Sequence, residues 1–348
     1  MLQHLKLFLA GSILSFGMRT NVTAQLFTPE FEHFNIEHGL PHSTVTSIVN
    51  DSYGYIWIGT EGGLARYDSR SFKIYLSDSL NNLLLANMIL MIHEDEDSVI
   101  WVGTRHSLEM YMRKTDNFRH FIFFPDANKN ESQMVTAFCK AGFNDYFICT
   151  NGGGLYRLKL KNGIYGPAEL RQAIVPEVCS RFSSICKEND SIIWFGTFTQ
   201  GIYRYNKNND KWKHISIDDT REVEIRCLVN NDARYIYIGT YDRGLCRMNK
   251  FTGKFDFFRY NEKDPATIGS DRILAMYREN SGNIWIGTDG GGLNYFNVET
   301  ESFTRIQNKG FDSKSLSNNS VYAVTVDREG NIWTGNYHGG VNLSKGNP

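Results

Sequence analysis

The sequence predicts an all-β protein, a seven-bladed β-propeller built from four-stranded antiparallel blades. A tetrad of the form Trp-Ile-Gly-Thr recurs along the chain at steps of 44, 46, 47, 43, 48 and 48 residues. A period in the mid-forties with several strands per unit is the sequence sign of a β-propeller. Five of the six tryptophans stand at the first position of this tetrad. The seven tetrads begin at Trp57, Trp101, Phe147, Trp194, Tyr237, Trp285 and Trp333.

The first repeat shows how each unit predicts a blade. Asp51 and Gly54 bound an Asp-x-x-Gly turn, in which Asp caps its own turn and Gly accepts a positive φ. The tetrad strand that follows is apolar on both faces, which is typical of a strand sandwiched between neighbouring sheets. Its glycine, Gly59, would let adjacent backbones approach closely, and Gly62 with Gly63 predicts a sharp corner. The four strands predicted here are 45–49, 55–60, 64–67 and 72–75.

The two ends of the chain complement each other. The seventh repeat stops after its third strand, Val341–Leu343, without the aromatic-x-x-apolar strand that ends other repeats. Phe31-Glu32-His33-Phe34 supplies that pattern near the N-terminus, so we expect residues 30–36 to form the outer strand of the last blade. Such closure removes open sheet edges and makes residues 25–348 one domain. The least regular unit is the third, whose fourth strand we place within residues 167–174.

The N-terminus predicts a signal peptide covering residues 1–24. A lysine at position 6 precedes a 12-residue apolar run, Leu7–Met18, and Val22-Thr23-Ala24 ends in a small residue. We expect cleavage after Ala24 and a periplasmic protein. The apolar run is too short to span a membrane comfortably, and no later stretch could do so.

Composition excludes some classes of partner. The 348 residues carry 37 basic and 38 acidic side chains, for a net charge of −1, which predicts no attraction to nucleic acid or to anionic membranes. The six cysteines are scattered through the repeats and predict small core residues, with a Cys139–Cys149 bridge as the alternative. The spacing of cysteine and histidine fits no metal site, and we expect no cofactor.

The corner between the second and third strands is our candidate binding site, because it opens on the same face of the disc as the connections between blades. In repeats one and six this corner is almost bare glycine, whereas other repeats carry large polar or aromatic residues. Such residues suit a planar, polar ligand such as a sugar; the alternative is that they are solvated loop residues. Blade connections add arginines and Asn319 to the same rim. The candidate ligand-binding residues are Arg105, His106, Arg181, Phe198, Gln200, Tyr241, Asp242, Arg243, Arg272, Tyr337 and His338.

Other clusters predict no catalytic or metal chemistry. Residues 94–97, Glu-Asp-Glu-Asp, lack the glycine and spacing of a calcium loop, and we expect a solvated acidic turn. The glycine triplets precede no helix and so predict corners rather than phosphate loops. A glycosidase would need two carboxylates at one site, and Asp242 could find one only in Glu61 or Asp289. We therefore expect a protein that is not an enzyme.

Residues 39–68 resemble the two-component regulator propeller repeat, in the order Gly39-Leu40-Pro41, Asp51-Ser52-Tyr53-Gly54, Trp57-Ile58-Gly59-Thr60, Gly62-Gly63-Leu64. Residues 268–297 and 317–343 are similar to it as well. The resemblance implies the exported sensor region of a hybrid two-component system. In such systems two propellers precede a β-sandwich, one membrane helix and a cytoplasmic histidine kinase, and the sensor detects oligosaccharides. The family supplies no catalytic residues to transfer.

Three functions remain open at this stage. The leading hypothesis is a periplasmic ligand-sensing propeller of a two-component system that binds an oligosaccharide and is not itself catalytic. The second is an interaction scaffold for another exported protein, a second propeller or a second copy of the chain. The third is a polysaccharide lyase or hydrolase. Because the sequence has one propeller and no kinase, we expect either the first part of a longer sensor or a free-standing exported propeller.

Overall fold

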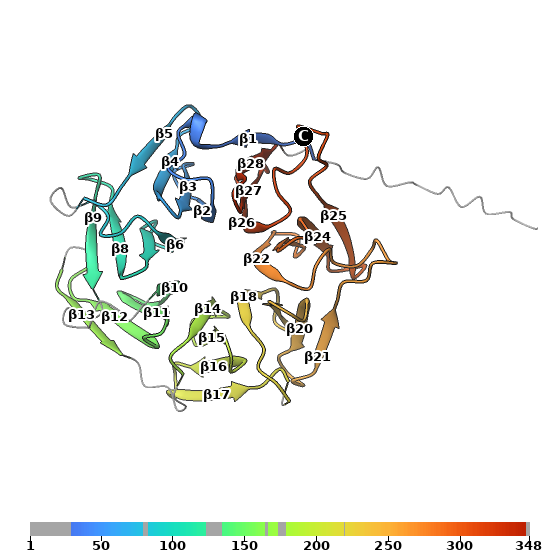
Figure 1. Ribbon diagram of the computed structural model, residues 1–348. Helices are drawn as coiled ribbons and strands as arrows, with labels where there is room; N and C mark the ends of the chain where they lie inside the picture. Colours follow the sequence, from blue (N-terminus) through green and yellow to red (C-terminus); the bar gives the residue numbers. More distant parts are fainter. Residues whose placement is uncertain are drawn as a thin grey trace, which may run out of the picture.

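The computed structural model describes residues 29–78, 83–122, 134–163, 166–172, 179–218 and 220–345. Within them, seven four-stranded sheets surround a common axis, which confirms the predicted seven-bladed propeller (Figure 1). The predicted signal peptide, residues 1–24, lies outside the described residues. No helix in the described part of the chain is long and apolar enough to cross a membrane.

Blades 1 to 4 each contain four strands paired in chain order, with the first strand nearest the axis. Blade 1 consists of β2 (Val45–Asn50), β3 (Ile56–Thr60), β4 (Gly63–Tyr67) and β5 (Phe72–Tyr75). Blade 2 consists of β6 (Ile89–Glu94), β7 (Ile100–Thr104), β8 (Ser107–Met112) and β9 (Asn117–Ile122). Blade 3 consists of β10 (Met134–Gly142), β11 (Asp145–Asn151), β12 (Leu155–Leu160) and β13 (Ala168–Gln172). Blade 4 consists of β14 (Phe182–Lys187), β15 (Ile192–Thr197), β16 (Ile202–Asn206) and β17 (Lys211–Ile215).

Blades 5 and 6 repeat this arrangement, and blade 7 draws its fourth strand from the other end of the chain. Blade 5 consists of β18 (Ile225–Asn230), β19 (Tyr235–Thr240), β20 (Leu245–Asn249) and β21 (Phe255–Phe258). Blade 6 consists of β22 (Ile273–Arg278), β23 (Ile284–Thr288), β24 (Leu293–Asn297) and β25 (Ser302–Ile306). Blade 7 consists of β26 (Val321–Val326), β27 (Ile332–Asn336), β28 (Gly340–Ser344) and β1 (Glu32–Phe34).

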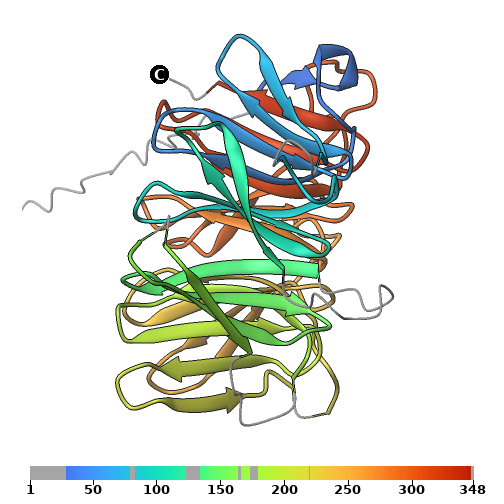
Figure 2. The same cartoon turned by 90° about the vertical axis from the view of Figure 1, so that its left-hand side faces the viewer.

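The closing strand confirms the prediction made from the two chain ends. β1 pairs antiparallel with β28, with His33 opposite Asn342 (Figures 1 and 2). The strand is shorter than the predicted residues 30–36, since it ends at Phe34. Asn35 instead caps a 3₁₀ helix, η1 (Ile36–His38), by accepting a hydrogen bond from the backbone N–H of Glu37 at 2.9 Å.

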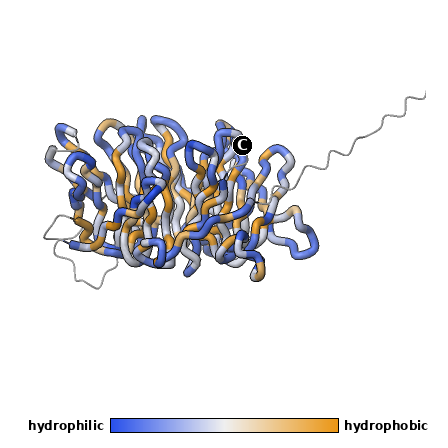
Figure 3. The backbone as a smooth tube through the Cα atoms, turned by 90° about the horizontal axis from the view of Figure 1, so that it is seen from above, coloured by the Kyte–Doolittle hydropathy of each residue, from blue (hydrophilic) through white to orange (hydrophobic). Residues whose placement is uncertain are grey.

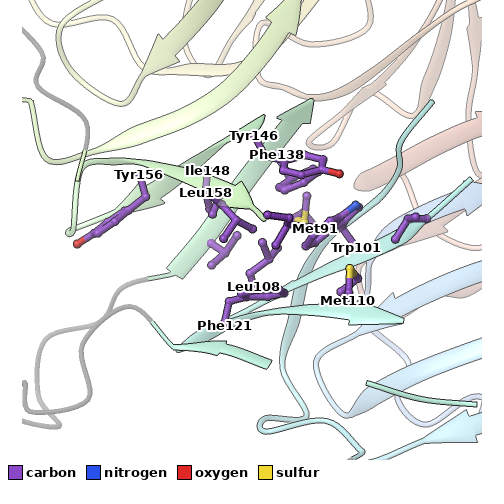
Figure 4. Packing of buried hydrophobic residues seen from close by; sticks show 13 residues of the cluster. Met91, Trp101, Leu108, Met110, Phe121, Phe138, Tyr146, Ile148, Tyr156 and Leu158 are labelled. Atoms are coloured by element: carbon purple, nitrogen blue, oxygen red, sulfur yellow. The ribbon is translucent and has the colours of Figure 1, made fainter. Parts of the chain in front are cut away.

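The hydrophobic core lies between neighbouring blades, and polar residues gather in the loops at both faces of the disc (Figure 3). Every residue of β3 is buried, as a strand sandwiched between two sheets requires. In the cluster between blades 2 and 3, the ring of Trp101 stacks on Phe138 with centroids 4.5 Å apart (Figure 4). A Cβ added at Gly59 would lie 2.6 Å from Ile89 of the next blade, so glycine is required for this close approach.

A hydrogen bond joins each tetrad tryptophan to a carboxylate six residues earlier. Asp51 shows the arrangement: its Oδ1 accepts the backbone N–H groups of Tyr53 and Tyr55, each at 2.9 Å, and its Oδ2 accepts the indole N–H of Trp57 at 2.8 Å. The aspartate therefore caps its turn, as predicted, and also fixes the tryptophan. The other four pairs are Trp101–Asp95 (2.9 Å), Trp194–Glu188 (2.6 Å), Trp285–Glu279 (2.6 Å) and Trp333–Asp327 (2.8 Å).

This arrangement corrects the prediction of a solvated acidic turn at residues 94–97. Asp95 is only 5% exposed because it accepts the indole N–H of Trp101 and two backbone N–H groups. Glu94 accepts the backbone N–H of Ser52 from the preceding blade at 2.8 Å. The side chains of Glu96 and Asp97 are more than half exposed. Two of the four carboxylates thus stabilise the fold, and two face solvent.

The six cysteines are all free thiols, so the alternative of a Cys139–Cys149 bridge is wrong. The register of the β10–β11 hairpin places Cys139 opposite Phe147 and Cys149 opposite Ala137, so the two cysteines do not face each other. Three of the six are fully buried, as small core residues would be: Cys139, Cys149 and Cys246.

Candidate ligand-binding site on the rim of blades 4 to 7

The corner between the second and third strands of a blade is hydrogen-bonded to the connection that enters the same blade. In blade 4, for example, the backbone N–H of Phe198 donates to the carbonyl of Arg181 at 3.0 Å. These bonds place the corners and connections on one face of the disc, which we call the rim. The corresponding bonds in blades 5, 6 and 7 are Tyr241 N–Glu224 O (3.0 Å), Asp289 N–Arg272 O (2.8 Å) and Tyr337 N–Ser320 O (3.0 Å).

The corner backbone is held by the threonine that ends the tetrad and by one glycine. In blade 4 the hydroxyl of Thr197 donates to the carbonyl of Gly201 at 2.9 Å and accepts the backbone N–H of Gln200 at 2.8 Å. Gly201 has a φ of 76°, a left-handed conformation that favours glycine. Because this one glycine supplies the unusual dihedral, the intervening positions are free to carry large side chains. Blade 5 repeats the arrangement with Thr240 and Gly244.

Five rim side chains of blades 4, 5 and 6 alternate between guanidinium and aromatic ring. The guanidinium of Arg226 lies 5.7 Å from the ring centroid of Phe198 and 4.6 Å from that of Tyr241. Arg181 lies 5.3 Å from the Phe198 centroid, and Arg272 lies 5.8 Å from the Tyr241 centroid. Cations within about 6 Å of an aromatic face are attracted to it. We call this series the arginine–aromatic ladder: Arg181, Phe198, Arg226, Tyr241, Arg272.

Aromatic side chains continue the rim in blade 7. The ring centroids of Tyr322 and Tyr337 are 5.6 Å apart, and those of Tyr337 and His338 are 4.1 Å apart. Burial raises the pKa of the Tyr322 phenol, and the negative charge of Asp289 raises it further. Tyr322 therefore stays neutral at physiological pH and remains able to donate a hydrogen bond.

A cavity of about 490 Å³ adjoins the outer side of the blade 4 corner. Gln200 lines it, and so does the connection from blade 4 to blade 5. The hydroxyl and backbone N–H of Thr220, and then the guanidinium of Arg243, lower the pKa of Asp218 in its wall to about 2. We call this cavity the outer pocket; its lining residues are Thr199, Gln200, Gly201, His214, Ser216, Ile217, Asp218, Thr220, Arg221, Glu222 and Val223.

The structure brings most of the predicted site residues together. Arg181, Phe198, Tyr241 and Arg272 join the ladder, and Gln200 lines the outer pocket. Tyr337 and His338 form the blade 7 segment. Asp242 faces Arg221 of the pocket wall at 3.9 Å.

Three predicted residues have other surroundings. The side chain of Arg243 is only 9% exposed and pairs with Asp218, which makes it a support for the pocket wall, although its Nε is buried without a hydrogen-bond partner. Arg105 and His106 are exposed at the corner of blade 2. Among the described residues, no side-chain contact joins these two to the ladder.

Sequence reasoning missed two rim residues, Arg226 and Tyr322, because they occupy β-bulges. In each innermost strand the register skips one residue just after the buried apolar position, as between Ile225 and Cys227. A bulge re-aims its side chain out of the regular alternation. Comparing this position across the repeats would have singled out the arginine and the tyrosine. The residues at this bulge position in the seven blades are Thr46, Leu90, Thr136, Ser183, Arg226, Leu274 and Tyr322.

Comparison with known proteins identifies the repeat. Residues 39–62, 267–290 and 315–338 match the family described as two component regulator propeller. Three segments of the chain thus match this repeat, which confirms the resemblance found in the sequence.

The individual proteins that resemble this chain are either much longer than it or share little sequence identity with it. A histidine kinase of Formosa agariphila is 26% identical over 209 residues, which cover 59% of this chain and 12% of that protein. The extracellular domain of a hybrid two-component system from B. thetaiotaomicron has a TM-score of 0.76 at 24% identity, over 92% of this chain and 42% of that one. A streptogramin B lyase has a TM-score of 0.68 at 15% identity, over 92% of this chain and 98% of that one. The chain spans less than half the length of the first two, and the structural likenesses show the fold alone.

Proposed function

We propose that this propeller is the ligand-sensing module of an exported two-component signalling protein, that its rim binds an oligosaccharide, and that it is not itself catalytic. The arginine–aromatic ladder is the observation that carries the proposal. The matched repeats, the histidine kinase relative and the extracellular hybrid two-component domain support the signalling context.

The chemistry of the rim suits a sugar in three ways. The arginines that lie over the rings of Phe198 and Tyr241 offer planar arrays of N–H donors to sugar hydroxyls, and the two rings add apolar surface that a pyranose can contact. Tyr337 and His338 provide a further aromatic and polar segment in blade 7. The outer pocket, at about 490 Å³, lies within the range of roughly 300–1,000 Å³ typical of small-molecule sites.

The charge distribution on the rim favours binding over hydrolysis. A retaining or inverting glycosidase needs two carboxylates within about 5–10 Å that act on one bond. Asp289 instead accepts a hydrogen bond from the hydroxyl of Ser320 at 2.7 Å and lies 3.6 Å from Arg272. Asp242 lies 3.9 Å from both Arg221 and Arg243. Both carboxylates are thus engaged by arginine side chains of the rim.

Calorimetric titration of the mature protein, from Gln25 onward, with oligosaccharides that differ in sugar and linkage tests the proposal. We expect one class to bind and to raise the melting temperature, because a ligand that binds only the folded state stabilises it. Phe198→Ala and Tyr241→Ala should each weaken that binding about five- to thirtyfold, or ~1–2 kcal/mol. Phe251→Ala is the matched control, because Phe251 is 78% exposed in the turn between β20 and β21, away from the corners.

Three results would count against this function. No binding by any oligosaccharide would favour the scaffold hypothesis, with a second propeller, a second copy or another exported protein as the partner. Release of shortened sugars from a glycan would show an enzyme. Binding that survives both aromatic substitutions would place the site elsewhere on the disc.

A further inference from the structure

We infer that the ligand carries negative charge: the arginine–aromatic ladder selects an acidic oligosaccharide, whose successive carboxylate or sulfate groups are held by Arg181, Arg226 and Arg272. The inference rests on the proposed function and adds the charge class of the ligand. It depends on the N–H donors of these three arginines that have no partner, or only a weak one, within the protein.

Arg181 has the least compensated charge of the three. Its side chain is exposed, and its Nε donates to the amide oxygen of Asn151 at 3.0 Å, which is a neutral acceptor. Among the described residues no carboxylate lies within 4.0 Å of this guanidinium. Its two terminal nitrogens therefore present donors and a positive charge to whatever occupies the rim.

Arg226, in the middle of the ladder, has an unsatisfied donor. Its terminal nitrogen pairs with Glu224 at 2.7 Å, but its Nε is buried without a hydrogen-bond partner. Buried donors are nearly always satisfied in native proteins, so an orphaned one calls for an explanation. The side chain as a whole is 33% exposed, so an acidic ligand on the rim can reach the guanidinium from solvent.

Arg272, at the far end, is only weakly paired. Its nearest carboxylate oxygen, on Asp289, lies at 3.6 Å, which is too long for a hydrogen bond. The other oxygen of Asp289 already accepts the hydroxyl of Ser320 at 2.7 Å. The Arg272 side chain is 60% exposed, so its fork of donors is accessible from solvent.

The balance of the ladder is therefore positive, with three guanidinium groups against the two carboxylates of Glu224 and Asp289. A guanidinium presents its donors in a planar fork that matches the two oxygens of a carboxylate or sulfate, and such charge-assisted bonds are about twice as strong as neutral ones. The whole chain carries a net charge of −1 and would not attract anions in general. The preference for an acid is thus a local property of the ladder.

Matched ligands test this inference by calorimetric titration at physiological ionic strength. One arm uses an oligosaccharide of hexuronic acids, and a second uses the same oligosaccharide with its carboxyl groups reduced to hydroxymethyl groups. A third arm uses a sulfated oligosaccharide and distinguishes a sulfate from a carboxylate. We expect at least one acidic ligand to bind, and its neutral or desulfated counterpart to bind at least about tenfold more weakly. The affinity should also fall as salt is added, because charge pairs at a surface are screened.

Two exposed arginines allow a clean substitution series. Arg181→Met and Arg272→Met should each weaken the acidic ligand about tenfold and leave the neutral counterpart nearly unchanged. Arg70→Met is the matched control, since Arg70 is an exposed arginine in the turn between β4 and β5, away from the corners. Arg226→Lys keeps the charge but removes the fork, and it should also weaken the acidic ligand.

The outcomes separate this inference from the proposed function. Equal binding of the acidic and the neutral ligand would refute the charge preference while leaving a sugar-binding rim intact. An acidic ligand that binds Arg181→Met and Arg272→Met as tightly as the unaltered protein would also overturn the inference. Failure of every oligosaccharide to bind would overturn the proposed function as well.

Discussion

The closing strand makes a quantitative prediction about stability, which centres on Phe31. This side chain is only 3% exposed and packs in a cluster with Trp285, Leu293 and Leu316, which belong to blade 6 and to the connection that leads into blade 7. Its backbone N–H donates to the carbonyl of Lys314 at 2.8 Å. Phe31→Ala would remove a buried aromatic ring and leave a cavity, a change that costs about 3–5 kcal/mol in protein cores. We expect about 3 kcal/mol, because Phe31 lies at the edge of the core and its surroundings can relax.

Equilibrium unfolding in urea, followed by tryptophan fluorescence, measures this loss. Phe143→Ala is the matched control, because it removes the same side chain from a position that is 90% exposed, and it should change the free energy of unfolding by less than about 0.5 kcal/mol. At roughly 2 °C per kcal/mol for a domain of this size, Phe31→Ala should also lower the melting temperature by about 6 °C. If the two variants unfold at the same urea concentration, the N-terminal strand does not close the ring.

Three further predictions concern ionisable groups. Asp51→Asn should cost about 3 kcal/mol in urea unfolding, because both carboxylate oxygens accept hydrogen bonds and an amide has only one oxygen, so its NH2 group would face either the backbone N–H groups or the indole N–H and the Arg113 guanidinium. Asp68→Asn, in an exposed turn, should cost almost nothing. Thr220 and Arg243 lower the pKa of Asp218 to about 2, so its stabilising contribution should be complete above about pH 3.9 and disappear only as the pH falls through about 2; an NMR titration of this carboxyl with a midpoint near 3.9 would contradict the pairing. Burial raises the pKa of five thiols, so a thiol reagent at pH 8 should modify them only after unfolding, and rapid native modification of more than one cysteine would show a looser core. The five are Cys139, Cys149, Cys186, Cys227 and Cys246.

Much of the fold was predictable because each repeat contains short sequence motifs that determine local structure. The turn glycines, the buried tetrad and the outer aromatic strand each have one structural meaning, and their period fixes the number of blades. The seventh repeat lacks its fourth strand, and residues 31–34 have the pattern of such a strand but belong to no complete repeat. This match predicted the pairing of β1 with β28. The predicted length of that strand was wrong because a capping side chain at Asn35 ends it early.

The pairing of tryptophan with an acid six residues earlier was visible in the sequence but was not recognised. The two repeats that lack tryptophan, at Phe147 and Tyr237, also lack the acid, with Ala141 and Asn231 in its place. This joint absence is the signal that an indole N–H needs an acceptor. It would have shown that Asp95 is a buried acceptor rather than a solvated turn residue.

The site residues at the corners could be predicted from the sequence, whereas those in the innermost strands could not. Corner residues such as Tyr241 stand out because they replace glycine, whereas Arg226 lies inside a strand whose alternation is shifted by a bulge. The direction of Arg243 was also beyond sequence reasoning. It depends on an ion pair with Asp218, which lies 25 positions earlier, in the connection from blade 4 to blade 5.

The antiparallel pairing of β1 with β28 determines how the ring would respond to mechanical tension. The first residue of β1, Glu32, lies opposite Leu343, so the chain enters one strand and leaves the other at the same end of the ladder. Tension applied between the two ends would therefore peel the hydrogen bonds apart one after another, a mode that resists less force than sliding two strands past each other. The buried ring of Phe31, which precedes the first pair, would bear that tension before any strand bond does.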